Sequence, residues 1–364
     1  EANEEGTDEV RSGEDIDLSD SDPRGFALDH IENIVLIGAL GIGATGNARN
    51  NSIVGNDASN ALEGGDGDDT LVGLDGDDIL TGGGGANSLV GGSGNDTYVI
   101  EATPNPDGSV TIQDTLVEDP GGGIDEIRVA ADVDLSQLPD FENVLLLDAA
   151  SPNFNVIGND QNNTIAGNTG NNSLDGGAGL DSLFGNEGND TYFVDVAGDV
   201  VTENAGGGLA DLVISSSESY SLPDNVEDLV LIGGPGSMGR GNIQPNQITG
   251  SNASNSLFGN EGNDTILGLK GNDTLDGGLG TDSLLGGEGD DVYLIIDGND
   301  EIIDSSGNKD KVILNSYVDA VVRKNANTGS VIFLDPPAIT FDETNPTVAG
   351  GGAEFFLALD TLEL

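Results

Sequence analysis

Aspartate recurs in this sequence every nine residues, inside turns that are rich in glycine. Residues 64–81 hold two such turns in succession, with Asp69 and Asp78 at the sixth place of consecutive nine-residue units. Regular coiling of such a chain would bring like charges together, which is unfavourable unless a cation lies between them. Carboxylates and backbone carbonyls together form the oxygen ligand set that Ca²⁺ prefers. These residues therefore indicate cation binding.

The composition of the chain agrees with this interpretation. Its 364 residues include 10 Lys and Arg against 66 Asp and Glu, a formal charge of −56, which argues against binding to nucleic acid or anionic membranes. The 58 glycines, the 4% aromatic residues and the absence of tryptophan are untypical of a globular core. The sequence has no cysteine and no apolar run of about 18 residues, so we expect neither thiolate metal sites nor a membrane span.

The nine-residue unit occurs in three blocks, 46–99, 158–193 and 241–294. Each block opens with asparagine at the sixth place, changes to aspartate, and closes on a tyrosine. The spacers repeat related phrases, such as "QDTLVE" at 113–118 and "GDVVTE" at 198–203, which favours further turns of the same kind. We therefore expect one continuous calcium-binding solenoid over residues 25–315, after an acidic tail at 1–24 and before a β cap at 316–364.

Each unit predicts one very short strand with a single inward apolar side chain, followed by a glycine-rich turn. Two units make a coil of 18 residues with a strand on each side. Stacked coils form two parallel sheets, in which neighbouring strands are about 4.8 Å apart. One apolar residue in nine buries too little surface to offset the chain entropy, so bound ions must contribute. The expected single-file core is Leu71, Leu80, Leu89, Ile165, Leu174, Leu183, Ile266, Leu275 and Leu284.

Stacking places each residue next to the residue 18 positions later. The sixth-place aspartates then pair as Asp78 with Asp96, Asp264 with Asp282, and Asp273 with Asp291. The same step leads from Asp181 to Asp199 and from Asp282 to Asp300 in the spacers. With small insertions, Asp96 meets Asp125, Asp190 meets Asp211, and Asp291 meets Asp310.

The units "GGDGDDTLV", "GNEGNDTIL" and their copies resemble the repeats-in-toxin (RTX, haemolysin-type) calcium-binding proteins. The resemblance implies an all-β, right-handed parallel β-roll or β-helix of stacked 18-residue coils with an irregular C-terminal β cap. It also implies Ca²⁺ ions at multiple sites. Each ion would be held by the second and fourth carbonyls of one turn, the first and third carbonyls of the turn one coil later, and both aspartates.

The carboxylate ligands expected on this basis are Asp69, Asp78, Asp96, Asp125, Asp181, Asp190, Asp199, Asp211, Asp264, Asp273, Asp282, Asp291, Asp300 and Asp310. The expected carbonyl ligands are Gly65, Gly67, Gly76, Gly82, Gly91, Gly177, Gly179, Gly188, Gly262, Gly271, Gly277, Gly280 and Gly286, together with position 74, where the sequence has Leu74 instead of glycine.

Asparagine replaces the ligand aspartate at the start of each block, at Asn51, Asn60, Asn163, Asn172, Asn246 and Asn255. A neutral amide can hydrogen-bond the turn but lacks the charge for tight calcium binding. We therefore expect ion-free turns there and ion-filled turns later in each block. Asn87 would lie opposite Asp69, and the sequence leaves open whether this pair binds an ion.

The two ends of the chain depart from the repeat. Residues 1–22 are too acidic to fold alone. From about 316 the pattern predicts a β-hairpin turning at Asn327–Gly329, and 353–364 is strongly apolar. This last segment could cap the solenoid, direct secretion or contact a neighbouring molecule.

Two classes of function remain open. The first is a secreted, non-enzymatic structural protein, such as a surface-layer, sheath, matrix or filament subunit that self-associates into a homopolymer. The alternative is the calcium-folded secretion region of a larger enzyme, toxin or adhesin, which the missing initial methionine favours. No H-E-x-x-H, G-x-S-x-G or Walker motif is present, so no catalytic residue is expected. An ice- or glycan-binding face is a weaker possibility. The resemblance implies an extracellular location, reached from a Gram-negative bacterium by a type I pathway.

Overall fold

The computed structural model describes residues 7–19, 30–101, 103–104, 110–149, 153–296, 300–303, 310–314, 321–324, 331–334 and 356–358. These residues divide between two compact units, 1–183 and 184–364. Within the described ranges the chain is strand and turn, apart from one short 3₁₀-helix at Leu135–Gln137. The expected all-β parallel solenoid of stacked coils is confirmed.

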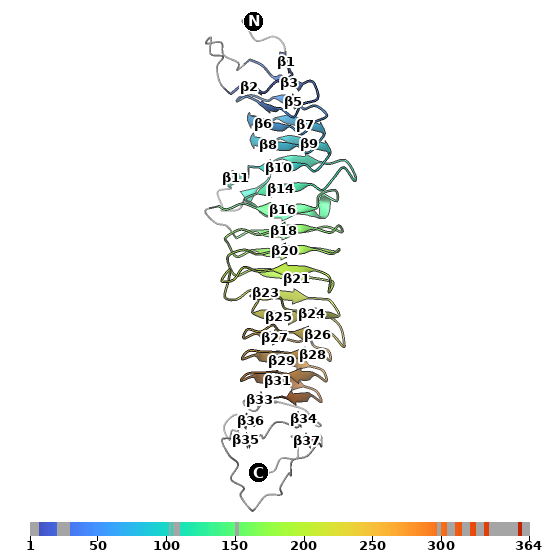
Figure 1. Cartoon of the computed structure of the whole chain (residues 1–364), viewed down its shortest axis with the longest axis vertical. Coiled ribbons are helices and arrows are strands. Elements are labelled where there is room, and N and C mark those ends of the chain that lie inside the picture. Colours follow the sequence, from blue (N-terminus) through green and yellow to red (C-terminus); the bar gives the residue numbers. More distant parts are fainter. Residues whose placement is uncertain are drawn as a thin grey trace, which may run out of the picture. The chain divides into compact units, whose positions relative to one another are not determined.

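The strands of the first unit stack as successive rungs, each rung being one coil of the chain (Figure 1). Leu71 pairs with Leu89 and Leu62 with Leu80, so neighbouring rungs are in the 18-residue register that the sequence predicts. The first sheet contains β1 (Glu9–Ser12), β3 (Asn33–Leu36), β5 (Ser52–Val54), β7 (Thr70–Asp75), β9 (Ser88–Ser93) and β13 (Thr115–Val117). The second contains β2 (Ile16–Asp17), β4 (Gly43–Thr45), β6 (Ala61–Asp66), β8 (Ile79–Gly84), β10 (Thr97–Ile100), β14 (Glu126–Val129), β16 (Asn143–Leu146) and β18 (Thr164–Ala166).

Three further strands of this unit, β15 (Val133–Asp134), β17 (Asn155–Ile157) and β19 (Ser173–Asp175), pair in parallel, and β11 (Thr103–Pro104) pairs with β12 (Val110–Thr111) in antiparallel. The division between the units falls in β20 (Ser182–Phe184).

The second unit repeats this construction. One sheet contains β21 (Thr191–Val194), β23 (Leu212–Ser215), β25 (Asp228–Leu231), β27 (Gln247–Thr249), β29 (Thr265–Lys270), β31 (Ser283–Glu288) and β33 (Glu301–Ile303). The other contains β24 (Ser219–Ser221), β26 (Met238–Arg240), β28 (Ser256–Phe258), β30 (Thr274–Asp276), β32 (Val292–Ile295) and β34 (Lys311–Leu314), and β22 (Val200–Thr202) precedes them in the chain.

The core is a file of inward side chains, one from each short strand of the repeat and two from longer strands such as β3, which buries Ile34 and Leu36. All nine residues expected in the core are fully buried, with no exposed surface. Tyr98, Tyr192 and Tyr293 hold the same place at the block ends and are equally buried. The ring of Tyr98 packs edge-on against Phe141 with 5.1 Å between the centroids. The larger tyrosine side chain thus fills the core where the regular repeat ends.

Both ends of the chain contribute strands. Residues 9–17, inside the segment expected to be an acidic tail, form β1 and β2, which pair in parallel with β3 and β4. Near the other end, β35 (Val321–Lys324) and β36 (Val331–Leu334) form an antiparallel pair where the hairpin was predicted, although its turn at Asn327–Gly329 lies outside the described residues. β36 pairs with β33, and β37 (Phe356–Ala358) pairs with β34.

The described residues contain no helix with the length and apolar character needed to cross a membrane.

Candidate metal centres

The sixth-place aspartates lie in stacked turns and bond from one rung to the next. The backbone N–H of Asp78 donates to Oδ1 of Asp96 at 2.7 Å, and the N–H of Asn60 donates to Oδ1 of Asp78 at the same distance. In the second unit, the N–H of Asp264 donates to Asp282 at 2.8 Å and that of Asp273 to Asp291 at 2.9 Å. One oxygen of each carboxylate is therefore used to hold the preceding turn.

The other carboxylate oxygen has a different environment. Asp78, Asp264 and Asp273 are each only 1% exposed, yet their Oδ2 atoms accept no hydrogen bond. A buried anionic oxygen without a donor is costly, and a cation is a partner that removes the cost. Elsewhere among the described residues, the same lack of a hydrogen-bond donor is found at the buried Oδ2 atoms of Asp69, Asp96, Asp114, Asp211 and Asp291.

The glycine that opens each turn leaves space beside this oxygen. A Cβ atom on Gly259 would lie 2.2 Å from Oδ2 of Asp264 and 2.3 Å from the carbonyl oxygen of Gly277. The carboxylate of one turn and the first carbonyl of the turn in the next rung therefore face the same small space. Gly64, Gly73 and Gly268 have the same two kinds of neighbour. These donors fit Ca²⁺, which is held by carboxylate and carbonyl oxygens.

Burial perturbs these carboxylates strongly in the calcium-free protein. The pKa of Asp78, Asp264 and Asp273 is raised to about 7. The larger cause is burial away from solvent, and a smaller one is repulsion from the next aspartate in the stack. The pKa of Asp69 rises to about 6, mainly by burial. Backbone N–H donors oppose these shifts without cancelling them. The stacked turns thus hold negative charge that the protein alone does not neutralise.

The asparagine turns differ in their hydrogen bonds. Oδ1 of Asn60 accepts from the N–H of Asn56 at 2.8 Å, and its Nδ2 donates to the carbonyl of Ile42 in the preceding rung at 3.1 Å. The amide therefore bonds to both its own turn and its neighbour without a cation. Asn51, Asn163, Asn172 and Asn246 make the same two kinds of bond, whereas Nδ2 of Asn255 has no acceptor. This geometry supports the expectation of ion-free turns.

Asn87, which the sequence left open, stacks between two carboxylates. Its Oδ1 accepts from the N–H of Asp69 at 2.9 Å, and its Nδ2 donates to Oδ1 of Asp114 at 2.9 Å. Asp114 lies 27 residues further along the chain, in the spacer. This partner was not predicted from the sequence, because Asp114 is not in a nine-residue unit and was not matched to a sixth-place residue.

Spacer aspartates continue the stack as expected from the sequence. Asp125, Asp211, Asp300 and Asp310 accept through Oδ1 from the N–H groups of Asp96, Asp190, Asp282 and Asp291, at 2.7 to 3.2 Å. Oδ2 of Asp199 accepts from the N–H groups of Asp195 and Val196 in its own turn. Asp181 accepts from the N–H of Asn163 at 2.8 Å.

Glutamates also enter the stack, although the nine-residue pattern did not predict them. The N–H of Asp125 donates to Glu142 at 2.9 Å, and that of Asp211 donates to Glu227 at 3.0 Å. The repeated phrases "FENVLLLD" and "VEDLVLIG" carry both glutamates and were the available signal.

Position 74 requires a correction to the expected glycine pattern. Leu74 has a φ of 86°, the left-handed region that Gly65, Gly83 and Gly92 adopt at the same place in their turns. Leu269, at the same place in its turn, also adopts the left-handed region, with a φ of 74°. Since the expected ligand is a backbone carbonyl, a leucine can supply it, at a conformational cost that glycine avoids.

Stacked turns with paired, buried carboxylates on a parallel solenoid define a calcium-binding β-roll. The family described as the RTX calcium-binding nonapeptide repeat (4 copies) matches residues 45–80, 63–98, 157–192, 241–275 and 258–293. The chain carries RTX calcium-binding repeats. A search among curated proteins finds no significant match to the chain.

The raised pKa values predict that acid stabilises the calcium-free fold. Because the folded pKa of Asp78, Asp264 and Asp273 is about 7 against 3.8 for an ordinary aspartate, the folded state binds more protons between these values. The resulting stability is complete below about pH 4 and is lost as the pH rises through about 7. In excess chelator, we therefore expect more of the β-sheet circular dichroism to remain at pH 5.5 than at pH 8, where the calcium-free repeats unfold.

Millimolar calcium provides the control for this measurement. Protons then compete with the ion for the same oxygens, so the urea midpoint of the calcium-loaded protein should fall from pH 8 to pH 5.5. A calcium-free β-sheet signal that grows as the pH rises would contradict the assignment of these carboxylates as buried and uncompensated.

Proposed function

We propose that the protein is a secreted, non-enzymatic structural protein that calcium folds and stiffens, and that its copies assemble into a surface layer, sheath, matrix or filament. The observation that carries this proposal is the repetition of buried, uncompensated carboxylates along the rungs of both units. Such a chain is rigid only where ions fill the turns, so calcium outside the cell would switch it from a loose to a stiff state. RTX repeats are typical of proteins secreted by Gram-negative bacteria, which supports the location.

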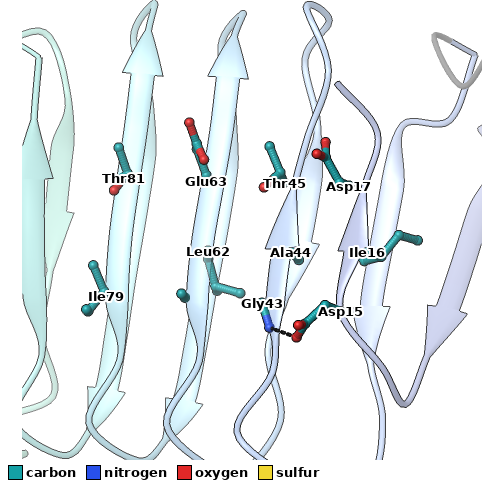
Figure 2. Close-up of a pocket in the computed structure, with 11 residues that line it drawn as sticks. Asp15, Ile16, Asp17, Gly43, Ala44, Thr45, Leu62, Glu63, Ile79 and Thr81 are labelled. Carbon is teal, nitrogen blue, oxygen red and sulfur yellow. Dashed lines mark hydrogen bonds between the residues drawn. The ribbon is translucent and has the colours of Figure 1, made fainter. Parts of the chain in front are cut away.

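The non-enzymatic part of the proposal is supported by the surface of the first unit. An open groove of about 370 Å³ runs over β2, β4, β6 and β8 (Figure 2). Its polar side chains are Asp15, Asp17, Thr45, Glu63 and Thr81, and the Asp15 carboxylate accepts from the N–H of Gly43 at 2.8 Å. This lining contains no histidine, lysine, arginine or aromatic residue that would bind a substrate or transfer a proton.

Self-association is proposed from the strand edges and the distribution of charge. β1 and β2 are the first strands of their sheets, and their outer edges have no partner among the described strands. Such edges are templates for pairing with another chain. The N-terminal segment is acidic, whereas Lys309, Lys311, Arg323 and Lys324 make the other end the most basic part of the sequence. A head-to-tail contact between copies would join opposite charges.

Light scattering after size-exclusion chromatography and electron microscopy, both in millimolar calcium, test this proposal. We expect concentration-dependent assemblies that dissociate when calcium is chelated. A strict monomer in calcium would contradict the structural role. It would favour the alternative, in which these repeats are the folding and secretion region of a larger toxin, enzyme or adhesin. The complete reading frame tests that alternative directly.

A further inference from the structure

Two groups of three buried carboxylates lie where the first and second blocks end. In the first unit the group is Asp96, Glu118 and Asp125, and in the second it is Asp190, Glu203 and Asp211. In each group, one oxygen atom from every residue lies within 4.8 Å of the others. Since a Ca²⁺–oxygen bond is about 2.4 Å, the three oxygens of a group lie close enough to share one ion after side-chain shifts of a few tenths of an ångström.

Glu118 occupies a place that belongs to glycine in the regular repeat. β9 and β13 pair Val90 with Val117, so the next step of the register sets Glu118 opposite Gly91. In the regular turns this place supplies a carbonyl oxygen to the ion space. Here a Cβ atom on Gly91 would lie 2.3 Å from Oε1 of Glu118 and 2.4 Å from Oδ2 of Asp96. The glutamate side chain therefore points into the space that the carbonyl lines elsewhere.

A second observation is that a carboxylate oxygen in each group has no hydrogen-bond donor within the described part of the protein. Asp96 is 1% exposed and Asp211 has no exposed surface, yet the Oδ2 atom of each has no hydrogen-bond donor. The backbone cannot satisfy these atoms, because the N–H of Asp96 donates to Asp125 and that of Asp190 donates to Asp211. A buried anion of this kind needs a positive partner.

A tyrosine holds each glutamate in place. The hydroxyl of Tyr98 donates to Oε1 of Glu118, while the N–H of Gly91 donates to that hydroxyl at 2.7 Å. The hydroxyl of Tyr192 donates to Oε1 of Glu203 in the same way. The tyrosine and glutamate are 20 residues apart in the first group and 11 in the second. The same arrangement is thus reached through spacers of different length.

We propose that these groups are a second class of cation site, in which Glu118 and Glu203 supply a third carboxylate to a calcium ion. Tyr98 and Tyr192 are positioning residues that orient the glutamates. Three carboxylates attract a hard cation more strongly than the two of a regular turn, so these sites fill first and also accept lanthanide ions. The inference concerns ion binding alone and does not depend on the proposed structural role.

Calcium titration of the full chain by isothermal calorimetry tests this inference. In the double variant Glu118→Gln and Glu203→Gln, the two tightest ions should bind at least about tenfold more weakly, while the remaining ions bind as before. The variant Glu63→Gln and Glu218→Gln is the matched control, because it removes two exposed glutamates and the same charge. Its isotherm should equal that of the unmodified protein. Equal tight binding in both variants would overturn the proposal. A uniform loss of affinity at all sites would also overturn it, because the glutamates would then not define a separate class of site.

Terbium provides a measurement that needs no variant. An ion at either group lies beside Tyr98 or Tyr192, so the first equivalents of Tb³⁺ should give tyrosine-sensitised emission that calcium displaces. Sensitised emission that grows only after most of the bound terbium has been taken up would also overturn the proposal.

Discussion

Removal of calcium with a chelator is expected to unfold the repeats of both units. Each regular turn contributes one core side chain, whereas its carboxylate is buried without a full set of partners. At an ion concentration 100 times the dissociation constant, each site adds about 2.7 kcal/mol of stability, and this contribution disappears on chelation. With affinities of about 10⁻⁴–10⁻³ M, the extracellular class, the transition should fall in the millimolar range and be cooperative between neighbouring rungs.

Circular dichroism during a calcium titration measures this transition. The β-sheet signal should be lost in chelator, return with calcium, and fail to return with equal magnesium, which demands a regular octahedral site. A spectrum that stays unchanged after complete removal of calcium would show that the fold does not need the ion.

The second large effect is expected from filling the space beside the first glycine of a turn. In Gly259→Ala or Gly268→Ala, the new methyl group would lie 2.2 to 2.6 Å from the aspartate Oδ2 and the carbonyl of the next rung. Each variant should bind one calcium ion fewer. It should lose the stabilisation of that ion and a further ~1–3 kcal/mol from crowding, as measured by the urea midpoint in calcium.

Gly234→Ala is the matched control for these variants. Gly234 is an exposed glycine of the same unit, and a Cβ on it would have no neighbour within 4 Å. Its calcium stoichiometry should be unchanged and its stability within about 0.5 kcal/mol of the parent. If Gly259→Ala retained every ion, the ion could not lie beside Asp264.

The periodicity of the sequence is sufficient to predict the solenoid, because a nine-residue period gives one inward residue for each strand. Leu71 and Leu80 are buried as predicted, and Asp78 stacks on Asp96. In the spacers, insertions change the step from 18 to as many as 29 residues. The repeated spacer phrases were still sufficient to predict that Asp125 meets Asp96, whereas Asp114, 27 residues after Asn87, was missed because it was not matched to a sixth-place residue.

Two further features show why local pattern was insufficient. β1 and β2 lie in a segment with the acidic composition of an unfolded tail, but they pair in parallel with β3 and β4. Glu118 was not expected as a ligand, because its role depends on its position opposite Gly91 rather than on a motif around it. Both features result from tertiary pairing, which overrides local composition.

A crystal structure in millimolar calcium, with anomalous diffraction recorded to locate the ions, tests most directly whether calcium holds the stacked carboxylates. We expect anomalous peaks beside Oδ2 of Asp264 and Asp273, each also contacting the first carbonyl of the turn in the next rung. We expect no peak beside the amides of Asn60 and Asn246. A folded solenoid with no calcium at Asp264 and Asp273 would contradict the claim that divalent ions hold the stacked carboxylates together.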